Sequence, residues 1–458
     1  MIDAKLDVAG CAELEASEPG RNPLAAMVSC GRVRWSTVSR TAALLLGTIA
    51  GPLFAQNWIH EAPENSPPAR YVSATANDGA SGKVMLFGGY GASPGIFLSD
   101  TWSWDGADWT QESPAHSPSS RYGHAMAYDA AHGKVVMFGG WVSSGAYSSE
   151  TWVWNGTDWT LETPAASPPA RAYHAMKYDS ASGKVILFGG FGNNTVGFSD
   201  TWLWDGSNWS QAEPFTSPSA RAGSAMAYDM KENKVVLFGG VNKANTVFND
   251  TWEWDGGDWL QQTPSVSPLG RFFAGMAYDS EEGKVVMFGG TNNASDFSDT
   301  WYWDGTNWTS QSSSDVPGVR EGLAMAPDAQ GNVVMFGGYY RGFLGDTWVW
   351  TKSPQASLNP TNVSFGKQKV KSSSAAKPVK LTNSGVNTLT IHSFAFTGSD
   401  PKDFAESNNC HGSLKPGFAC TIDVTFKPTA KGARSAKLVI KDNGQNGSQS
   451  VALSGTGD

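Results

Sequence analysis

The chain has 458 residues and a formal net charge of −9, with 40% hydrophobic and 12% aromatic residues. An acidic chain lacks the basic surface that neutralises phosphates, so we expect no nucleic-acid partner. Beyond the N-terminal segment, no stretch reaches the roughly 18 consecutive apolar residues of a membrane-spanning helix, so we expect no such helix in the mature chain.

The N-terminal segment has the pattern of a secretory signal peptide. A cationic stretch beginning at Arg32 precedes the apolar segment 41–53, and a small-residue cleavage site ends at Ala55. Met27 stands just ahead of the cationic stretch, which predicts that it is the true start and that residues 1–26 are an over-extended reading frame. We therefore expect a secreted protein, with an extracellular, cell-surface or periplasmic fate.

A six-fold repeat follows, with a period of about 50 residues. Phe-Gly-Gly marks each unit, at Phe87, Phe138, Phe188, Phe238, Phe288 and Phe336. An arginine opens each unit, at Arg70, Arg121, Arg171, Arg221, Arg271 and Arg320. An acidic residue opens each Thr-Trp-x-Trp motif, at Asp100, Glu150, Asp200, Asp250, Asp299 and Asp346. Self-similarity at a fixed period predicts a repeat architecture.

Each unit contains the signals of four short strands. Alternating residues such as 124–129 are followed by a β-branched run such as 134–138, and Asp-Gly or Asn-Gly turns separate later strands. No segment shows a helical period. Because an open sheet of this length would expose long strand edges, we expect radial closure of the units into blades.

The paired glycines, the arginine, the Trp-x-Trp strand and a later tryptophan together resemble the kelch repeat, including its variant in galactose-oxidase central domains. The resemblance covers residues 56–352 and implies an all-β fold, a six-bladed kelch β-propeller. Kelch propellers include binding platforms, adhesins and a few enzymes, so the resemblance implies the fold far more than the function.

The sixth unit lacks its fourth strand and its last tryptophan. The missing piece stands at the other end of the repeat region, where Asn57-Trp58-Ile59-His60 matches Asp158-Trp159-Thr160-Leu161. We therefore expect the N-terminal strand to complete the last blade and close the ring.

The repeated tryptophans and arginines each allow two interpretations. Trp102 and Trp104, like the equivalent pairs, share one face of a strand and either pack between blades or form a carbohydrate-stacking surface. We favour packing, because every unit repeats the pair. The arginines either pair with the acid that opens each Trp-x-Trp strand or form an anion-binding ring, and we favour the internal pairing.

Residues 353–458 change character, because tryptophan disappears and lysine becomes frequent. Short alternating strands across this segment predict a β-sandwich. The pattern resembles the ASH/HYDIN-like immunoglobulin domains of exported bacterial choice-of-anchor D proteins, which space, anchor or contact partners. Cys410 and Cys420 are close enough in sequence to form a disulfide in an oxidising compartment. The chain thus divides into residues 1–55, 56–352 and 353–458.

Charge is distributed unevenly between these parts. Residues 56–354 carry 16 basic and 31 acidic side chains, a net of 16 − 31 = −15. Residues 355–458 carry 12 basic and 6 acidic side chains, a net of 12 − 6 = +6. The basic segment either contacts acidic envelope polymers or presents a solvated lysine-rich surface, and the second interpretation is favoured.

The sequence offers little catalytic chemistry. Copper radical oxidases, the enzymes suggested by the resemblance, need a cysteine cross-linked to a tyrosine, and residues 56–352 contain no cysteine. His124 and His174 occupy equivalent places and could share a metal, but the other four units supply Ser73, Ser224, Ala274 and Leu323. A structural role is favoured, and we expect neither a metal nor a cofactor.

Function is expected where the repeat varies, in the loops after each Gly-Gly pair. The candidate ligand-binding residues there are Tyr90, Trp141, Phe191, Tyr339, Tyr340 and Arg341. Aromatics that recur at the loop ends in all six units are interpreted as packing residues, namely Phe97, Tyr147, Phe198, Phe248, Phe297 and Phe343. The leading hypothesis is a monomeric, non-catalytic binding or adhesion protein whose partner is a protein or an extracellular glycan.

Two alternatives remain open. The first is a carbohydrate-active enzyme resembling kelch-fold sialic-acid epimerases, with Arg320, Glu321 and Arg341 as acid/base and anion-binding candidates. Glu321 stands where the other units have Tyr71, Tyr122, Ala172, Ala222 and Phe272, although a surface glutamate is the favoured interpretation. The second alternative is a structural component of the cell envelope.

Overall fold

The computed structural model describes residues 56–91, 96–193, 197–313, 315–352, 354–385, 387–444 and 447–458. The predicted signal peptide and the start at Met27 lie outside these ranges. Within them, no helix has the length and apolar character needed to cross a membrane.

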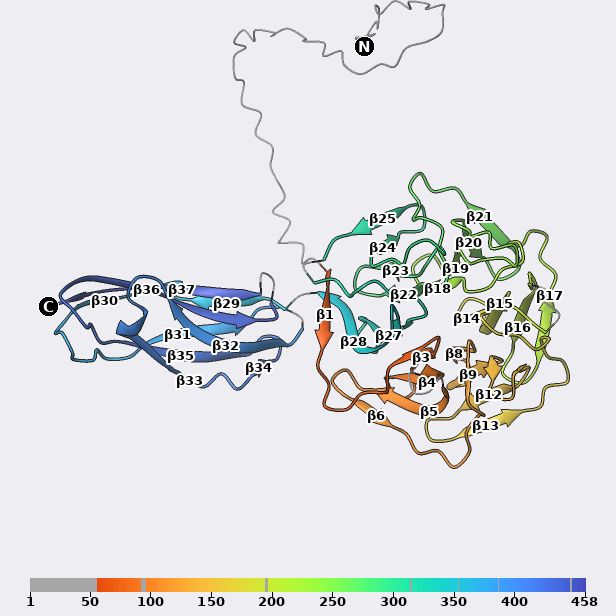
Figure 1. The fold of residues 1–458 in the computed structure, drawn as a ribbon, viewed down its shortest axis with the longest axis horizontal. Helices are drawn as coiled ribbons and strands as arrows, with labels where there is room; N and C mark the ends of the chain where they lie inside the picture. The colour runs from red at the N-terminus through yellow and green to blue at the C-terminus, as the bar shows by residue number, and fades with distance from the viewer. Residues whose placement is uncertain are drawn as a thin grey trace, which may run out of the picture. The chain divides into compact units, whose positions relative to one another are not determined.

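Antiparallel sheets built around four strands make up the described part of residues 56–352, and Figure 1 shows them arranged as a ring. The first sheet contains β2 (Arg70–Tyr71), β3 (Ala74–Asp78), β4 (Lys83–Gly91), β5 (Ile96–Trp104) and β6 (Trp109–Gln111). The second contains β8 (Ala125–Asp129), β9 (Lys134–Phe138), β12 (Thr151–Trp154) and β13 (Trp159–Glu162). A small sheet beside it contains β7 (Arg121–Tyr122), β10 (Trp141–Val142) and β11 (Ala146–Tyr147).

The remaining sheets follow the same order along the chain. The third contains β14 (Ala175–Asp179), β15 (Lys184–Phe188), β16 (Thr201–Trp204) and β17 (Trp209–Ala212). The fourth contains β18 (Ala225–Asp229), β19 (Lys234–Phe238), β20 (Thr251–Trp254) and β21 (Trp259–Gln262). The fifth contains β22 (Gly275–Asp279), β23 (Lys284–Phe288), β24 (Thr300–Trp303) and β25 (Trp308–Gln311). The sixth contains β26 (Ala324–Pro327), β27 (Val333–Tyr339), β28 (Phe343–Lys352) and β1 (Gln56–Glu61).

The third sheet shows why the sequence forms these strands. The second strand, β15, is a β-branched and apolar run whose last four residues are buried. The turn before it is held by Asp179, whose carboxylate accepts hydrogen bonds from the Ala181 amide and the Ser182 hydroxyl. The Asp205-Gly206 turn then returns the chain, with Gly206 at a φ of 97° that favours glycine. Local turn chemistry and the apolar run therefore define the sheet together.

The N-terminal strand closes the ring, as the sequence predicts. β1 pairs antiparallel with β28 over six residues, and Trp58 lies opposite Trp350. The same relation joins Trp159 to Trp154 in the second sheet. The first described strand of the chain thus completes a sheet whose other three strands come from residues 324–352.

The last tryptophan of each unit connects neighbouring sheets. Each is at most 1% exposed, and its indole N–H donates a 2.9–3.0 Å hydrogen bond to a threonine hydroxyl of an adjacent sheet. The second tryptophan of each Trp-x-Trp pair is buried as deeply, whereas the first is half-buried in every sheet except the first. The packing interpretation of the tryptophans is confirmed.

The six arginines form the predicted internal ion pairs. Each is at most 2% exposed and contacts its acid at 2.5–2.7 Å. The guanidinium also donates to the carbonyl of the first glycine of the Gly-Gly pair, at 2.9–3.1 Å. The acid in turn accepts a hydrogen bond from the first tryptophan of its Trp-x-Trp strand. Every arginine therefore stabilises its own unit by linking the Gly-Gly segment to the acid of the Trp-x-Trp strand.

The C-terminal part forms two further sheets. One contains β29 (Ala356–Asn359), β31 (Lys377–Asn383), β35 (Ala419–Phe426) and β33 (Phe404–Asn408), the last preceded by the 3₁₀ turn η1 (Pro401–Asp403). The other contains β30 (Asn362–Gln368), β37 (Ser448–Gly457), β36 (Gly432–Asp442), β32 (Leu389–Thr397) and β34 (Ser413–Leu414).

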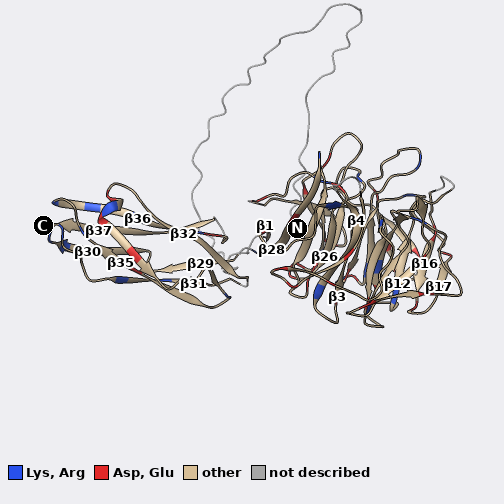
Figure 2. Ribbon diagram, turned by 60° about the horizontal axis from the view of Figure 1, so that its bottom comes forward, with Lys and Arg blue, Asp and Glu red and all other residues tan. Residues whose placement is uncertain are grey.

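Both C-terminal sheets contribute to one apolar core, which includes Leu381, Ile422, Leu438 and Val451. The structure joins Cys410 to Cys420 in a disulfide. Figure 2 shows charged residues as short coloured segments in otherwise uncharged strands, in this part and in the ring alike.

Candidate functional site

The variable loops are anchored by short β-pairs at one end of the ring, which we call the loop face. In every unit, the residue after Gly-Gly pairs with the residue after the arginine. The pairs are Tyr71 with Tyr90, Tyr122 with Trp141, Ala172 with Phe191, Ala222 with Val241, Phe272 with Thr291, and Glu321 with Tyr339. The side chains at this face are therefore held by backbone pairing, although they belong to loops.

A continuous set of aromatic contacts crosses the loop face. Tyr90 contacts both Tyr122 and Phe343, with ring centroids 5.3 and 5.9 Å apart. Tyr339 contacts Phe343 at 5.4 Å and Tyr71 at 5.9 Å. These contacts continue through the rings of Phe97, Tyr173, Phe272 and Phe273. We call these nine residues, which come from several units, the aromatic cluster.

The predicted binding residues divide into three groups. Tyr90 and Tyr339 belong to the aromatic cluster. Trp141 instead packs edge-on against Tyr147, at 4.5 Å, and the ring of Phe191 lies 4.1 Å from the ammonium group of Lys243. The third group is Tyr340 and Arg341, which are exposed and adjacent, with the guanidinium 5.2 Å from the Tyr340 ring. Ligand contact by any of them stays a prediction.

The sequence interpretation missed five members of this surface, namely Tyr71, Tyr122, Tyr173, Phe272 and Phe273. Three of the loop-end aromatics do pack as predicted, because arginine guanidinium groups lie 3.9–4.1 Å from the rings of Phe198, Phe248 and Phe297. The available signal for the missed residues was the strong variation of residue type at the two positions that follow each arginine.

The three catalytic candidates are in different environments. Arg320 is 2% exposed, and its guanidinium is committed to Asp346 and to the carbonyls of Gly318 and Gly337. These contacts hold the Arg320 guanidinium within the propeller, which corrects the assignment of Arg320 as a catalytic candidate. Glu321 is half-buried, and burial and the nearby Asp296 raise the pKa of its carboxyl to about 7. Arg341 is exposed on its turn.

A ring of backbone hydrogen bonds surrounds the axis beneath the loop face. Six equivalent residues each donate an amide hydrogen bond of 2.6–3.1 Å to the carbonyl of the preceding one, and the last connects back to the first. They are Val72, Gly123, Tyr173, Gly223, Phe273 and Gly322, all with positive φ. Bulky residues rarely adopt this conformation, so such strain often marks a functional place.

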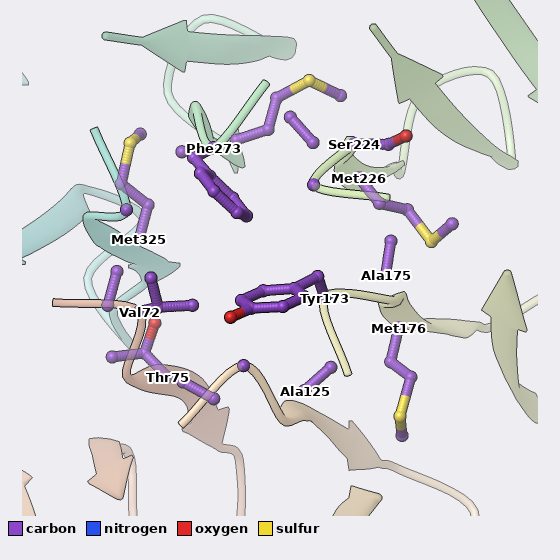
Figure 3. A pocket seen from close by; sticks show the side chains of 18 of the residues that line it. Val72, Thr75, Ala125, Tyr173, Ala175, Met176, Ser224, Met226, Phe273 and Met325 are labelled. Atoms are coloured by element: carbon purple, nitrogen blue, oxygen red, sulfur yellow. The ribbon is translucent and has the colours of Figure 1, made fainter. Parts of the chain in front are cut away.

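A cavity of about 160 Å³ lies at this ring. The rings of Tyr173 and Phe273 project into its middle, and Met176, Met226 and Met325 lie around them (Figure 3). Farther along the axis, a second cavity of about 150 Å³ is lined by tyrosines and alanines. The two cavities share Met126 and Lys177 in their linings, so we refer to them together as the axial channel, and Tyr173 and Phe273 of the aromatic cluster line the first one.

The two histidines are placed for packing. His124 and His174 are at most 6% exposed, and each ring lies 5.5 Å from a phenylalanine, Phe87 and Phe138 respectively. Burial, followed by the neighbouring arginine Arg121, lowers the pKa of His124 to about 3, so the imidazole is neutral. Within the described ranges, no three His, Cys, Asp or Glu side chains are grouped closely enough to hold a metal ion.

A family model described as KLHDC2/KLHL20/DRC7 Kelch-repeats domain matches residues 55–214 and 205–353. The chain belongs to the kelch-repeat family. A model described as Cep192 domain 4 matches residues 353–458. Among solved structures, the chain is similar to one titled "Structure of YjhT", at 16% identity and a TM-score of 0.48, covering 65% of this chain and 97% of that one. No curated protein matches the sequence.

The kelch propeller explains why its glycine pair recurs. Gly139 has a φ of 69°, and a Cβ atom there would lie 2.6 Å from the carbonyl oxygen of Arg171. Gly140 has a φ of 100°, and its Cβ would lie 2.9 Å from the His124 side chain. Only glycine fits both the conformation and the space, so the motif is a requirement of close packing at the loop face.

Proposed function

We propose that this protein is a secreted, non-catalytic binding protein that recognises its ligand with the loop face of a six-bladed kelch propeller. Residues 56–352 form the propeller and residues 353–458 an immunoglobulin-like domain of the ASH/HYDIN type, after removal of residues 1–55. The mature chain acts as a monomer in the extracellular or periplasmic space, and the C-terminal domain spaces or anchors the propeller.

The observation that carries the proposal is the aromatic cluster. Its members come from distant parts of the chain, yet their rings are in continuous contact at the end of the ring where the loops vary. Aromatic side chains offer a large contact area with few rotatable bonds, and tyrosines add a hydroxyl group for polar recognition. Because short β-pairs already fix these residues, little ordering entropy opposes binding.

The ligand class that this surface suits is an extracellular glycan or a protein. Tyr339 and Tyr340 are 38% and 37% exposed, so both retain free area for a partner. Sugar rings present C–H faces that stack on aromatic rings, and protein partners insert their own apolar anchors among them. The same surface chemistry serves both.

Substitution of the exposed tyrosines tests the proposal. We expect Tyr339→Ala and Tyr340→Ala each to weaken binding about 30-fold, which corresponds to about 2 kcal/mol for an aromatic anchor. The ligand is first found by screening the purified mature protein against a glycan array and a displayed peptide library, and affinity is then measured by calorimetry. Thermal melting should change little, because both side chains are exposed.

Phe215→Ala is the matched control. Phe215 is 95% exposed but lies outside both the aromatic cluster and the loops after the Gly-Gly pairs, so its removal should leave affinity unchanged. Equal loss of affinity in all three variants would show that general surface hydrophobicity, and not the loop face, mediates binding.

Glu321 gives the enzyme alternative one specific observation in its favour. A carboxyl with a pKa of about 7 can exchange protons near neutral pH, as a general acid or base must. If Glu321 acts as the acid, sugar turnover falls as pH rises through about 7, and Glu321→Gln abolishes turnover. A sugar-turnover screen followed from pH 5 to 9 checks this. A flat pH profile, or activity retained in Glu321→Gln, removes Glu321 from catalysis.

A further inference from the structure

A single lysine interrupts a ring of alanines inside the axial channel. Lys177 is the third residue of β14, the innermost strand of the third sheet. The equivalent positions in the other five innermost strands are Ala76, Ala127, Ala227, Ala277 and Ala326. Lys177 lines both axial cavities, so it stands where the two meet. The fold itself therefore needs no lysine at this place.

The Lys177 amine has no partner within the described part of the chain. Neither cavity has an aspartate or glutamate in its lining, and no hydrogen bond or ion pair holds the amine. Lys234, by contrast, bonds to Glu253 at 2.8 Å at the outer part of its sheet. Burial without a counter-charge lowers the pKa of Lys177 to about 8. A substantial fraction of the amine is therefore uncharged at neutral pH.

We propose that Lys177 is a carbonyl-binding residue that forms a reversible imine with small aldehydes entering the axial channel. This inference is independent of the loop-face proposal. The uncharged Nζ attacks the carbonyl carbon, and a proton passes from nitrogen to the former carbonyl oxygen, giving a carbinolamine. Loss of that oxygen as water leaves the C=N bond, and hydrolysis reverses the step. No oxidant or reductant is consumed.

The shape and lining of the channel favour an aldehyde of only a few non-hydrogen atoms. The two cavities measure about 160 and 150 Å³. Methionine and alanine side chains dominate the walls, and Tyr128, Tyr178 and Tyr228 line the second cavity. The mainly apolar lining of the second cavity favours the uncharged amine and a neutral ligand over an ion pair, because it offers little to solvate charge.

Reductive trapping tests the inference. The purified mature protein is incubated with acetaldehyde and cyanoborohydride at pH 7.5, and the alkylation of each lysine is followed by peptide mapping. At this pH a lysine with a pKa of about 8 is about 200-fold richer in free amine than one at the usual value of about 10.4. Lower basicity reduces intrinsic nucleophilicity, so we expect Lys177 to react at least about 10-fold faster than exposed Lys231.

Moving the lysine to an equivalent position tests whether the channel makes the amine reactive, independently of the residues next to position 177. Lys177→Ala restores the residue found at the five equivalent positions, so it should fold normally and lose the fast-reacting site. Adding Ala227→Lys to that variant places an amine at the equivalent position of the next sheet, and fast alkylation should reappear there. The inference is overturned if Lys177 reacts no faster than Lys231 in the unmodified chain, or if fast alkylation of other lysines persists in Lys177→Ala.

Discussion

Deleting residues 56–63 should abolish cooperative folding of the propeller. The deletion removes β1, all six of its pairings to β28, and the buried Trp58. It also removes the hydrogen bond from the Trp58 indole to the Thr300 hydroxyl, which connects the last sheet to the fifth. β28 then becomes an exposed strand edge on one side of an open ring, and such edges promote aggregation.

The expected measurements are loss of a sharp thermal transition and an increase in aggregate by size-exclusion chromatography. A single substitution, Trp58→Ala, should cost about 3–5 kcal/mol through the cavity that it leaves, without opening the ring. A synthetic peptide of residues 56–63, added to the deletion variant, should restore part of the transition. An unchanged melting temperature in the deletion variant would show that β1 is dispensable for closure.

Asp200→Ala should produce a large loss of stability, as should removal of the equivalent acid in another unit. It leaves the guanidinium of Arg171, which is 0% exposed, without its bidentate carboxylate partner. An unpaired buried charge costs about 3–5 kcal/mol. The substitution also removes the acceptor for the Trp202 indole N–H. Chemical denaturation of the purified variant measures the change.

Glu64→Ala provides the reference for a charge without an ion pair, because Glu64 is exposed, and should change stability by less than about 0.5 kcal/mol. The double variant Arg171→Met/Asp200→Ala should lose less than the sum of the two single variants, because removing both charges leaves neither one buried alone. If the stability losses of the two single variants were strictly additive, the Arg171–Asp200 ion pair would not stabilise the fold.

The sequence predicts which loops form the candidate site but not the contacts between their side chains. Repetition identifies the variable loops, so Tyr339, Tyr340 and Arg341 could be singled out as exposed candidates. The sequence could not show that Tyr90 contacts Phe343, which also contacts Tyr339, since Tyr90 is separated from the other two by most of the repeat region. The sequence predicts that the ring closes, but it does not show which side chains of the first and last units then come into contact.

The propeller itself is the part of the structure that the sequence determined. Glycine pairs, turn residues and period-two alternation act over a few residues, and each unit repeats them, so six copies specify the sheets and the arginine braces. The incomplete sixth unit and the orphan strand around Trp58 specify closure as well.

Only the tertiary structure decided how deeply each repeated or variable side chain is buried and which groups it contacts. Lys177 is the single departure from alanine among its equivalents, and Glu321 is the one charged residue at a variable position, but residue type alone does not reveal an environment. Their altered pKa values arise from burial and, for Glu321, from Asp296, which are properties of neighbours distant in the chain. The fold is thus specified by interactions that are local and repeated, whereas the chemistry of the candidate sites depends on non-local contacts that occur once.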